Sequence, residues 1–161
     1  MTAFNAYRQT TERQWTRIDM LIALYEATGQ TLDRGLNLAQ QIAADLGYAS
    51  PQPAPLKGER EMTREQSQLI IARSRATQLL LAILSGIDPE FDEVARNTQR
   101  LIIYCLDQVS ANSPDNWKAA QQTIETLTEG FRGIRREAQR LQLEGSIPDP
   151  FAESLHTLSA G

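Results

Sequence analysis

The sequence predicts an all-α protein, an antiparallel up-and-down four-helix bundle, and three observations support this prediction. Leu, Ala, Gln, Glu and Arg dominate the 161 residues, and these residue types favour helices. Apolar residues recur at steps of three and four along four segments, as on one face of a helix. Helix start and stop signals separate the segments. We expect one bundle domain at 16–145, between an extended leader at 1–15 and a tail at 146–161 with room for one short helix.

The first helix is predicted to begin at Thr16, because Asp19 completes a serine/threonine-x-x-acid capping pattern. Gly47 is its predicted stop. Three prolines in the segment 47–58 exclude helix there and indicate a connector within the domain. The predicted inward stripe of this helix consists of Ile18, Leu21, Ile22, Tyr25, Leu32, Leu36, Ala39 and Ala43.

The second helix begins after Thr63, where Gln66 completes the same capping pattern, and it breaks at Ser85-Gly86. Asp88-Pro89 then predicts the start of the third helix, with aspartate as N-cap and proline at the first helical position. The inward stripe of the second helix is Leu69, Ala72, Ala76, Leu79, Leu80, Ile83 and Ile87. That of the third is Phe91, Val94, Thr98, Leu101, Ile102, Cys105 and Val109.

The fourth helix begins at Ser113-Pro114-Asp115, which repeats the cap-then-proline signal. Its end is predicted near Glu144, with Gly145 as the left-handed stop. Its inward stripe is Trp117, Ala120, Ile124, Leu127, Phe131, Ile134, Ala138 and Leu141.

The helices carry more apolar residues than inward stripes require. A second row lies outside the stripe on each of the first three helices: Met20, Leu24, Leu38 and Ile42; Ile70, Ile71 and Leu81; Ile103 and Tyr104. A central helix touching three neighbours would explain single residues of this kind. The pattern as a whole indicates a surface that accepts an amphipathic or extended peptide.

Composition narrows the classes of partner. The net charge of -4 argues against a nucleic-acid or anionic-membrane binder, which usually displays a basic field. The sequence shows neither a signal-peptide pattern nor a run of about eighteen apolar residues, so we expect a cytoplasmic protein without membrane insertion. Cys105, the single cysteine, is predicted to be a small core residue.

The sequence offers little chemistry for an enzyme or a cofactor. Glu153 and His156 have the Glu-x-x-His spacing of di-iron bundles, but such sites need two motifs, so we expect neither metal nor cofactor. A cluster of four arginines, Arg132, Arg135, Arg136 and Arg140, ends the fourth helix. We expect these cations to oppose the helix dipole and to pair with Glu129, Glu137 and Glu144, while an acidic partner there stays open as an alternative.

Two N-terminal elements resemble a known family. Ala6-Tyr7-Arg8-Gln9-Thr10-Thr11, followed after about ten residues by Met20-Leu21-Ile22-Ala23-Leu24-Tyr25-Glu26-Ala27, is similar to the flagellin export chaperones of the FliS family. The similarity runs over residues 6–139, and its specific motifs are these two elements.

The resemblance implies a non-enzymatic cytoplasmic chaperone. Its partner would be the disordered C-terminal segment of flagellin, or another unfolded export client, which it holds until secretion. Phe4 and Tyr7 would cover part of the client groove, and the chaperone would be a monomer or a homodimer. Tyr25 stays open between a core role and client contact. The expected partner-binding residues are Phe4, Tyr7, Met20, Leu24, Tyr25, Leu38, Ile42, Ile103 and Tyr104. The alternative is a helical adaptor or self-associating interaction module.

Overall fold

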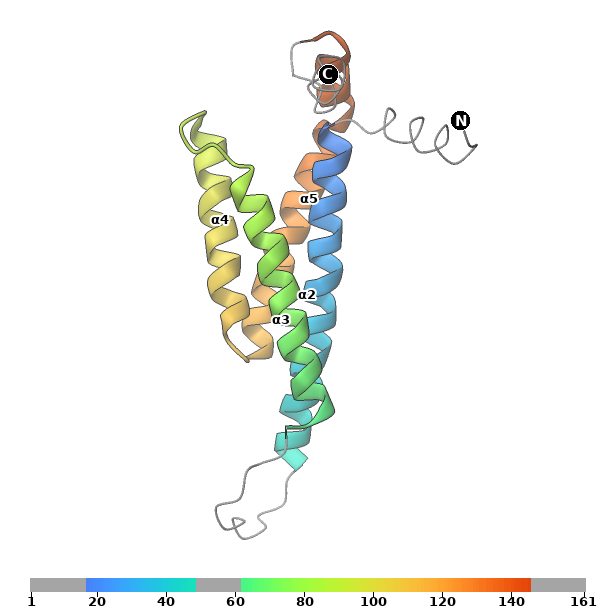
Figure 1. Ribbon diagram of the computed structural model, residues 1–161, viewed down its shortest axis with the longest axis vertical. Helices are drawn as coiled ribbons and strands as arrows, with labels where there is room; N and C mark the ends of the chain where they lie inside the picture. The colour runs from blue at the N-terminus through green and yellow to red at the C-terminus, as the bar shows by residue number, and fades with distance from the viewer. Residues whose placement is uncertain (1–16, 49–61, 146–161) are drawn as a thin grey trace, which may run out of the picture. The chain divides into compact units, whose positions relative to one another are not determined.

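The computed structural model describes residues 17–48 and 62–145, and this part of the chain contains four helices and no strand (Figure 1). They are α2 (Arg17–Tyr48), α3 (Arg64–Ser85), α4 (Glu93–Ser110) and α5 (Pro114–Leu143). Antiparallel contacts join α2 to α3, α3 to α4, α4 to α5 and α2 to α5, which confirms the predicted fold class. The leader, most of the proline-rich connector and the tail lie outside the described residues.

The chain divides into two compact units. The central unit is Tyr25–Thr126 and contains α3, α4 and the adjoining parts of α2 and α5. The described residues of the terminal unit are 17–24, from the start of α2, and 127–145, from the second half of α5.

The ends of α3 agree with the prediction. The Gln66 backbone N–H donates to Thr63 Oγ1 at 3.2 Å, and the Thr63 N–H donates to Gln66 Oε1 at 3.0 Å, so the capping box is closed. At the other end, the Gly86 N–H donates to the Ile83 carbonyl at 3.1 Å. Both ends of α3 therefore satisfy backbone groups that a helix terminus leaves unpaired.

The predicted start of α4 is wrong by four residues. Asp92, and not Asp88, is the N-cap, and its Oδ1 accepts from the Ala95 N–H at 2.6 Å. Asp88 instead accepts from the Glu90 N–H at 3.0 Å, an aspartate turn that closes before the helix begins. Phe91 therefore falls in the turn, where it is 80 % exposed, and not on the inward stripe.

Helix α5 begins and ends as predicted. The N–H groups of Asn116 and Trp117 donate to the Ser113 carbonyl at 3.1 and 3.3 Å, and Pro114 occupies the first helical position. Gly145 has a φ of 76°, the left-handed conformation that ends many helices. Gly47, by contrast, does not stop α2, which continues through Tyr48.

The core of the central unit is built on Trp117. Its side chain is fully buried, and its Nε1 donates to the Ala111 carbonyl at 3.1 Å. The indole ring lies against the backbone of Gly35 on α2, where a Cβ atom would overlap it. Tyr25, Leu32, Leu80, Ile102 and Ile124 are also fully buried. The contact between Trp117 and Gly35 sets the register of α2 against α5. Ala43, eight residues beyond Gly35 on α2, was predicted to face inward but is exposed.

The terminal unit is joined by polar contacts between the start of α2 and the end of α5. The Arg17 N–H donates to Gln142 Oε1 at 2.8 Å, which satisfies one backbone donor of the first turn of α2. Asp19 forms an ion pair with Arg135 at 2.5 Å and accepts from Gln139 Nε2 at 3.2 Å. Asp19 therefore connects the helices rather than only capping α2; Thr16, its predicted capping partner, lies outside the described residues.

Several further residues depart from the predicted stripes. Val94, Leu101 and Ile134 were expected to face inward but are 71 %, 40 % and 53 % exposed. On α4 the buried residues are Ile102, Cys105 and Val109, and Val94 and Leu101 lie at the edge of that stripe.

Leu38 shows the opposite error. It was predicted to be on the outer row of α2, but it is buried. It lies one helical turn from Arg34 and two from Thr31, and both of those residues line a hollow against α3. The row that includes Leu38 therefore faces α3 at this level and is covered by it.

We predict that Gly35→Ala destabilises the protein by about 1–3 kcal/mol, because a methyl group there collides with a fully packed tryptophan ring. Gly130→Ala is the matched control, since no atom lies within 4 Å of a Cβ at that helical position. The control should be neutral or stabilising by up to about 1 kcal/mol, from helix propensity alone. Urea unfolding followed by circular dichroism measures both; equal stability changes would contradict the close contact.

Candidate partner-binding surface

Helix α4 exposes apolar side chains on both sides of its buried stripe. Ile103 lies on the side toward α3 and is 50 % exposed. Leu101 and Tyr104 lie beyond the other edge of the stripe and are 40 % and 43 % exposed, and Tyr104 shares the outward face of α4 with Ile103, about 100° away around the helix. Gln108, on that side too, accepts from Asn116 Nδ2 of α5 at 2.7 Å. The residues 101–106 are apolar all round, and the protein buries only part of that surface.

Helix α3 extends this apolar surface. Ile70 and Leu81 lie on one face of the helix, eleven residues apart, and both are 50 % exposed. Arg73 Nε donates to the Val109 carbonyl at 2.8 Å and fixes the antiparallel register of α3 and α4. In this register Leu81 and Ile103 differ by about 3 Å along the helix axes. We call Ile70, Leu81, Leu101, Ile103 and Tyr104 the α3–α4 apolar surface.

The remaining expected partner-binding residues are distributed differently. Met20, in the terminal unit, is 41 % exposed, and Leu24 and Ile42 are half-buried. Tyr25 and Leu38 belong to the core of the central unit, so exposure was wrongly predicted for Leu38, and the open assignment of Tyr25 resolves toward the core. Phe4 and Tyr7 lie outside the described residues.

Tyr25 and Cys105 are two titratable groups inside the core of the central unit. Burial, and secondarily the charge of Cys105, raise the pKa of Tyr25 far above its usual range. Burial raises the pKa of the Cys105 thiol to about 11, although a hydrogen bond with Thr123 lowers it slightly. The thiol lies 3.8 Å from the Ala120 carbonyl. Cys105 therefore stays protonated near neutral pH, which removes the thiolate that nucleophilic chemistry requires.

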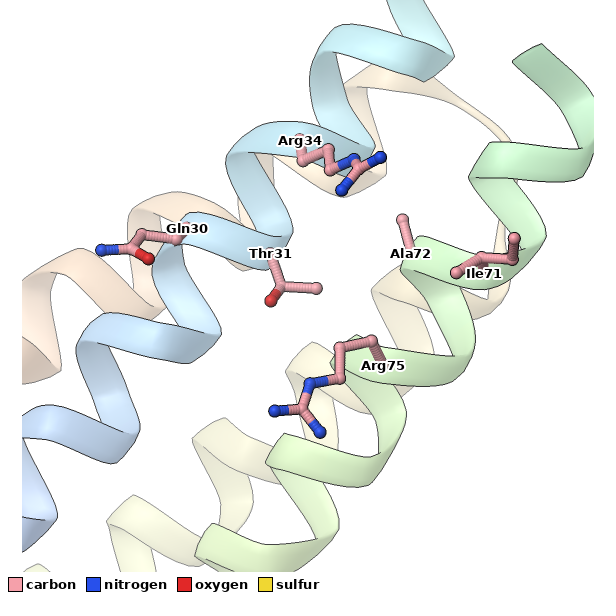
Figure 2. Close-up of a pocket in the computed structure, with 6 residues that line it drawn as sticks. All are labelled: Gln30, Thr31, Arg34, Ile71, Ala72 and Arg75. Atoms are coloured by element: carbon pink, nitrogen blue, oxygen red, sulfur yellow. The ribbon is translucent and has the colours of Figure 1, made fainter. Parts of the chain in front are cut away.

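A second feature of the central unit is a hollow between α2 and α3 (Figure 2). Its volume is about 310 Å3, and it is lined by Gln30, Thr31, Arg34, Ile71, Ala72 and Arg75. Arg34 reaches into the gap from α2, and Arg75 reaches into it from α3. Sequence reasoning missed both arginines, because only the pairing of the two helices brings them to the same hollow.

Two of the four arginines at the end of α5 pair as predicted, whereas Arg135 pairs with Asp19 of α2 instead. Arg132 pairs with Glu129, and Arg140 pairs with Glu137 at 2.5 Å and with Glu144 at 2.6 Å. The hydrogen bonds from Arg140 lower the pKa of Glu137, and Glu137 and Glu144 raise that of Arg140. These pairs are solvent-exposed, and their geometry offers no unoccupied anion site at Arg132 or Arg140.

Residues 17–48 and 62–145 contain no group of three or more His, Cys, Asp or Glu side chains placed to hold a metal ion. No helix within those ranges is long and apolar enough to cross a membrane. Glu153 and His156, the candidate metal ligands of the sequence, lie outside them.

The fold and its exposed surface define a four-helix protein with an apolar face on α3 and α4. The sequence matches no protein-family model, and comparison with curated proteins gives no match.

We predict that the free energy of unfolding falls as pH rises from about 9 to about 11. The folded state keeps the Cys105 thiol protonated, whereas the unfolded chain ionises it at lower pH, so this contribution is complete below about pH 9 and is lost above it. The loss should not exceed about 2 kcal/mol for Cys105, and Tyr25 adds to it at the alkaline end.

Urea titrations at four pH values across this range measure the slope, and Cys105→Ala is the comparison. The variant should show a shallower decline, because it has no thiol to ionise. Identical slopes for the two proteins would show that Cys105 does not carry the effect.

Proposed function

We propose that this protein is an export chaperone of the flagellin-binding kind, which holds the disordered C-terminal segment of flagellin against its α3–α4 apolar surface. The observation that carries the proposal is α4, where Leu101, Ile103 and Tyr104 remain 40–50 % exposed around a buried stripe. Exposed apolar side chains that cluster on one part of a protein commonly mark a partner site.

The chemistry of this surface fits an unfolded client better than a small molecule. The exposed side chains are spread along two antiparallel helices, so they offer a long track instead of a closed cavity. A disordered segment that orders on binding must recover its lost entropy by burying apolar area along such a track. Three exposed polar residues each lie one helical turn from a member of this surface and form its polar rim: Gln78, Asn97 and Arg100.

The resemblance of residues 6–11 and 20–27 to the flagellin export chaperones supports the same proposal and supplies the identity of the client. In the structure Met20 is accessible and Leu24 partly so, whereas Tyr25 anchors the core. We therefore assign the client contact to the α3–α4 apolar surface, with Met20 as a further exposed position. The protein acts by holding its client and carries out no reaction on it.

Calorimetry with a synthetic peptide of the flagellin C-terminal segment tests this proposal. We predict binding with a large negative heat-capacity change, because the peptide orders as it buries apolar surface. Leu101→Asp and Ile103→Asp should each weaken binding at least tenfold, since each places a charge in the contact. Gln40→Asp, an exposed position on α2 with the same charge change outside that surface, should leave the affinity within about twofold.

Thermal melts must show that all three variants keep the fold. Absence of heat at micromolar peptide would contradict the chaperone proposal. If the two α4 variants also abolished self-association of the free protein, the interaction-module alternative would replace it.

The leader gives an independent prediction. If Phe4 and Tyr7 cover part of the client surface, deletion of residues 1–12 should leave unfolding cooperative and raise the affinity for the flagellin peptide several-fold, because no competing segment must leave. The double substitution Phe4→Ser/Tyr7→Ser should reproduce the effect of the deletion. Loss of cooperative unfolding in the truncated protein would assign the leader a structural role instead.

A further inference from the structure

The hollow between α2 and α3 is lined by two arginines and, among the residues that the structure describes, by no acid. Arg34 and Arg75 enter it from opposite helices, and the other residues that line it, Gln30, Thr31, Ile71 and Ala72, are uncharged (Figure 2). Both arginines border a hollow that opens to solvent, so an anion in it would meet positive charge from two helices.

Arg34 and Arg75, like Arg100 and Arg136, have no acid within reach along their own helices, but Arg34 and Arg75 also line a hollow. Positions three and four residues away from Arg34 and Arg75 hold no acid, so neither can form an ion pair along its own helix. Among the residues that the structure describes, neither forms an ion pair with any other element. Arg132, Arg135 and Arg140, by contrast, each pair with a carboxylate, and Arg73 donates to the Val109 carbonyl and to Asn112.

The floor of the hollow is apolar. Ala72 is buried there, and Ile71 beside it is 67 % exposed and lines the same space as Arg75. A ligand that fills the hollow would therefore meet two cationic donors and an aliphatic side chain at once. Guanidinium groups bind carboxylates through paired charge-assisted hydrogen bonds, which are stronger than neutral ones.

We propose that this hollow binds the carboxylate of an aspartate or glutamate side chain of a protein partner, with a neighbouring aliphatic residue of that partner packed on Ile71. The hollow opens to solvent between exposed side chains, and its volume of about 310 Å3 accommodates a carboxylate together with one aliphatic side chain. The carboxylate pairs with a guanidinium group that lines the hollow, the second arginine adds to the positive charge there, and Ile71 selects for a peptide over a free ion. This inference goes beyond the chaperone proposal, because it needs neither flagellin nor the α3–α4 apolar surface.

Nuclear magnetic resonance titration of the full chain tests the inference with a capped tetrapeptide, acetyl-Leu-Asp-Ala-Leu-amide. The probe should shift the Nε–Hε signals of Arg34 and Arg75 and the methyl signals of Ile71 in a saturable way. Its affinity should fall at least fivefold between 50 and about 300 mM salt, as expected for partly exposed ion pairs. The matched peptide with asparagine in place of aspartate should bind at least tenfold more weakly.

Two double variants of equal net charge distinguish peptide binding at the hollow from attraction to the overall charge of the protein. Arg34→Gln/Arg75→Gln should weaken binding of the aspartate peptide at least tenfold. Arg96→Gln/Arg100→Gln removes the same charge from exposed positions of α4 and should change the affinity less than twofold. Equal losses in the two variants would show that the attraction is non-specific and would overturn the inference.

Other outcomes also overturn it. If the asparagine peptide binds as well as the aspartate peptide, the hollow recognises only the aliphatic part. If inorganic phosphate binds more tightly than the aspartate peptide and leaves the Ile71 methyl signals unmoved, the hollow takes a free oxyanion and not a partner's side chain. If the peptide causes no shift at 20 mM, roughly the weakest binding that a single exposed ion pair supports, the site does not exist. Flagellin takes no part in this assay, so its failure leaves the chaperone proposal unaffected.

Discussion

The close approach of the Trp117 ring to the backbone of Gly35 is the constraint on which the central unit depends. One fully buried side chain brings together the middle of α2, the end of α4 through the Ala111 carbonyl, and the first turn of α5. Because a glycine permits this distance and the indole hydrogen bond fixes the ring, the helices can meet in only one register. That register determines which rows of α2 and α4 are covered, and therefore which apolar residues stay exposed.

Local signals predicted the helix ends well, with informative exceptions. The capping box at Thr63, proline at the start of α5 and left-handed Gly145 were all confirmed, since each depends on residues within one turn. The start of α4 was predicted wrongly because Asp88 and Asp92 both have cap chemistry. Sequence alone does not decide which of the two caps the helix and which closes a turn.

Which side chains are buried, and which residues meet at a candidate site, depends on how the helices pack as well as on the local sequence. The exposed positions Ile70, Leu81 and Ile103 could be predicted, because they lie far around the wheel from the buried stripe. The burial of Leu38 could not be predicted, because the sequence does not show that α3 covers that face of α2 at that level. Arg34 and Arg75 are 41 residues apart in sequence, and nothing local to either indicates that the other lies across the same hollow.

The burial of Trp117 also gives the protein an internal optical reporter. The chain has two tryptophans, and the second, Trp15, belongs to the leader. Replacing Trp15 with phenylalanine would leave a single indole whose emission arises at the point where three helices meet. The emission wavelength of Trp117 would then report the assembly of the central unit during refolding, with no contribution from Trp15.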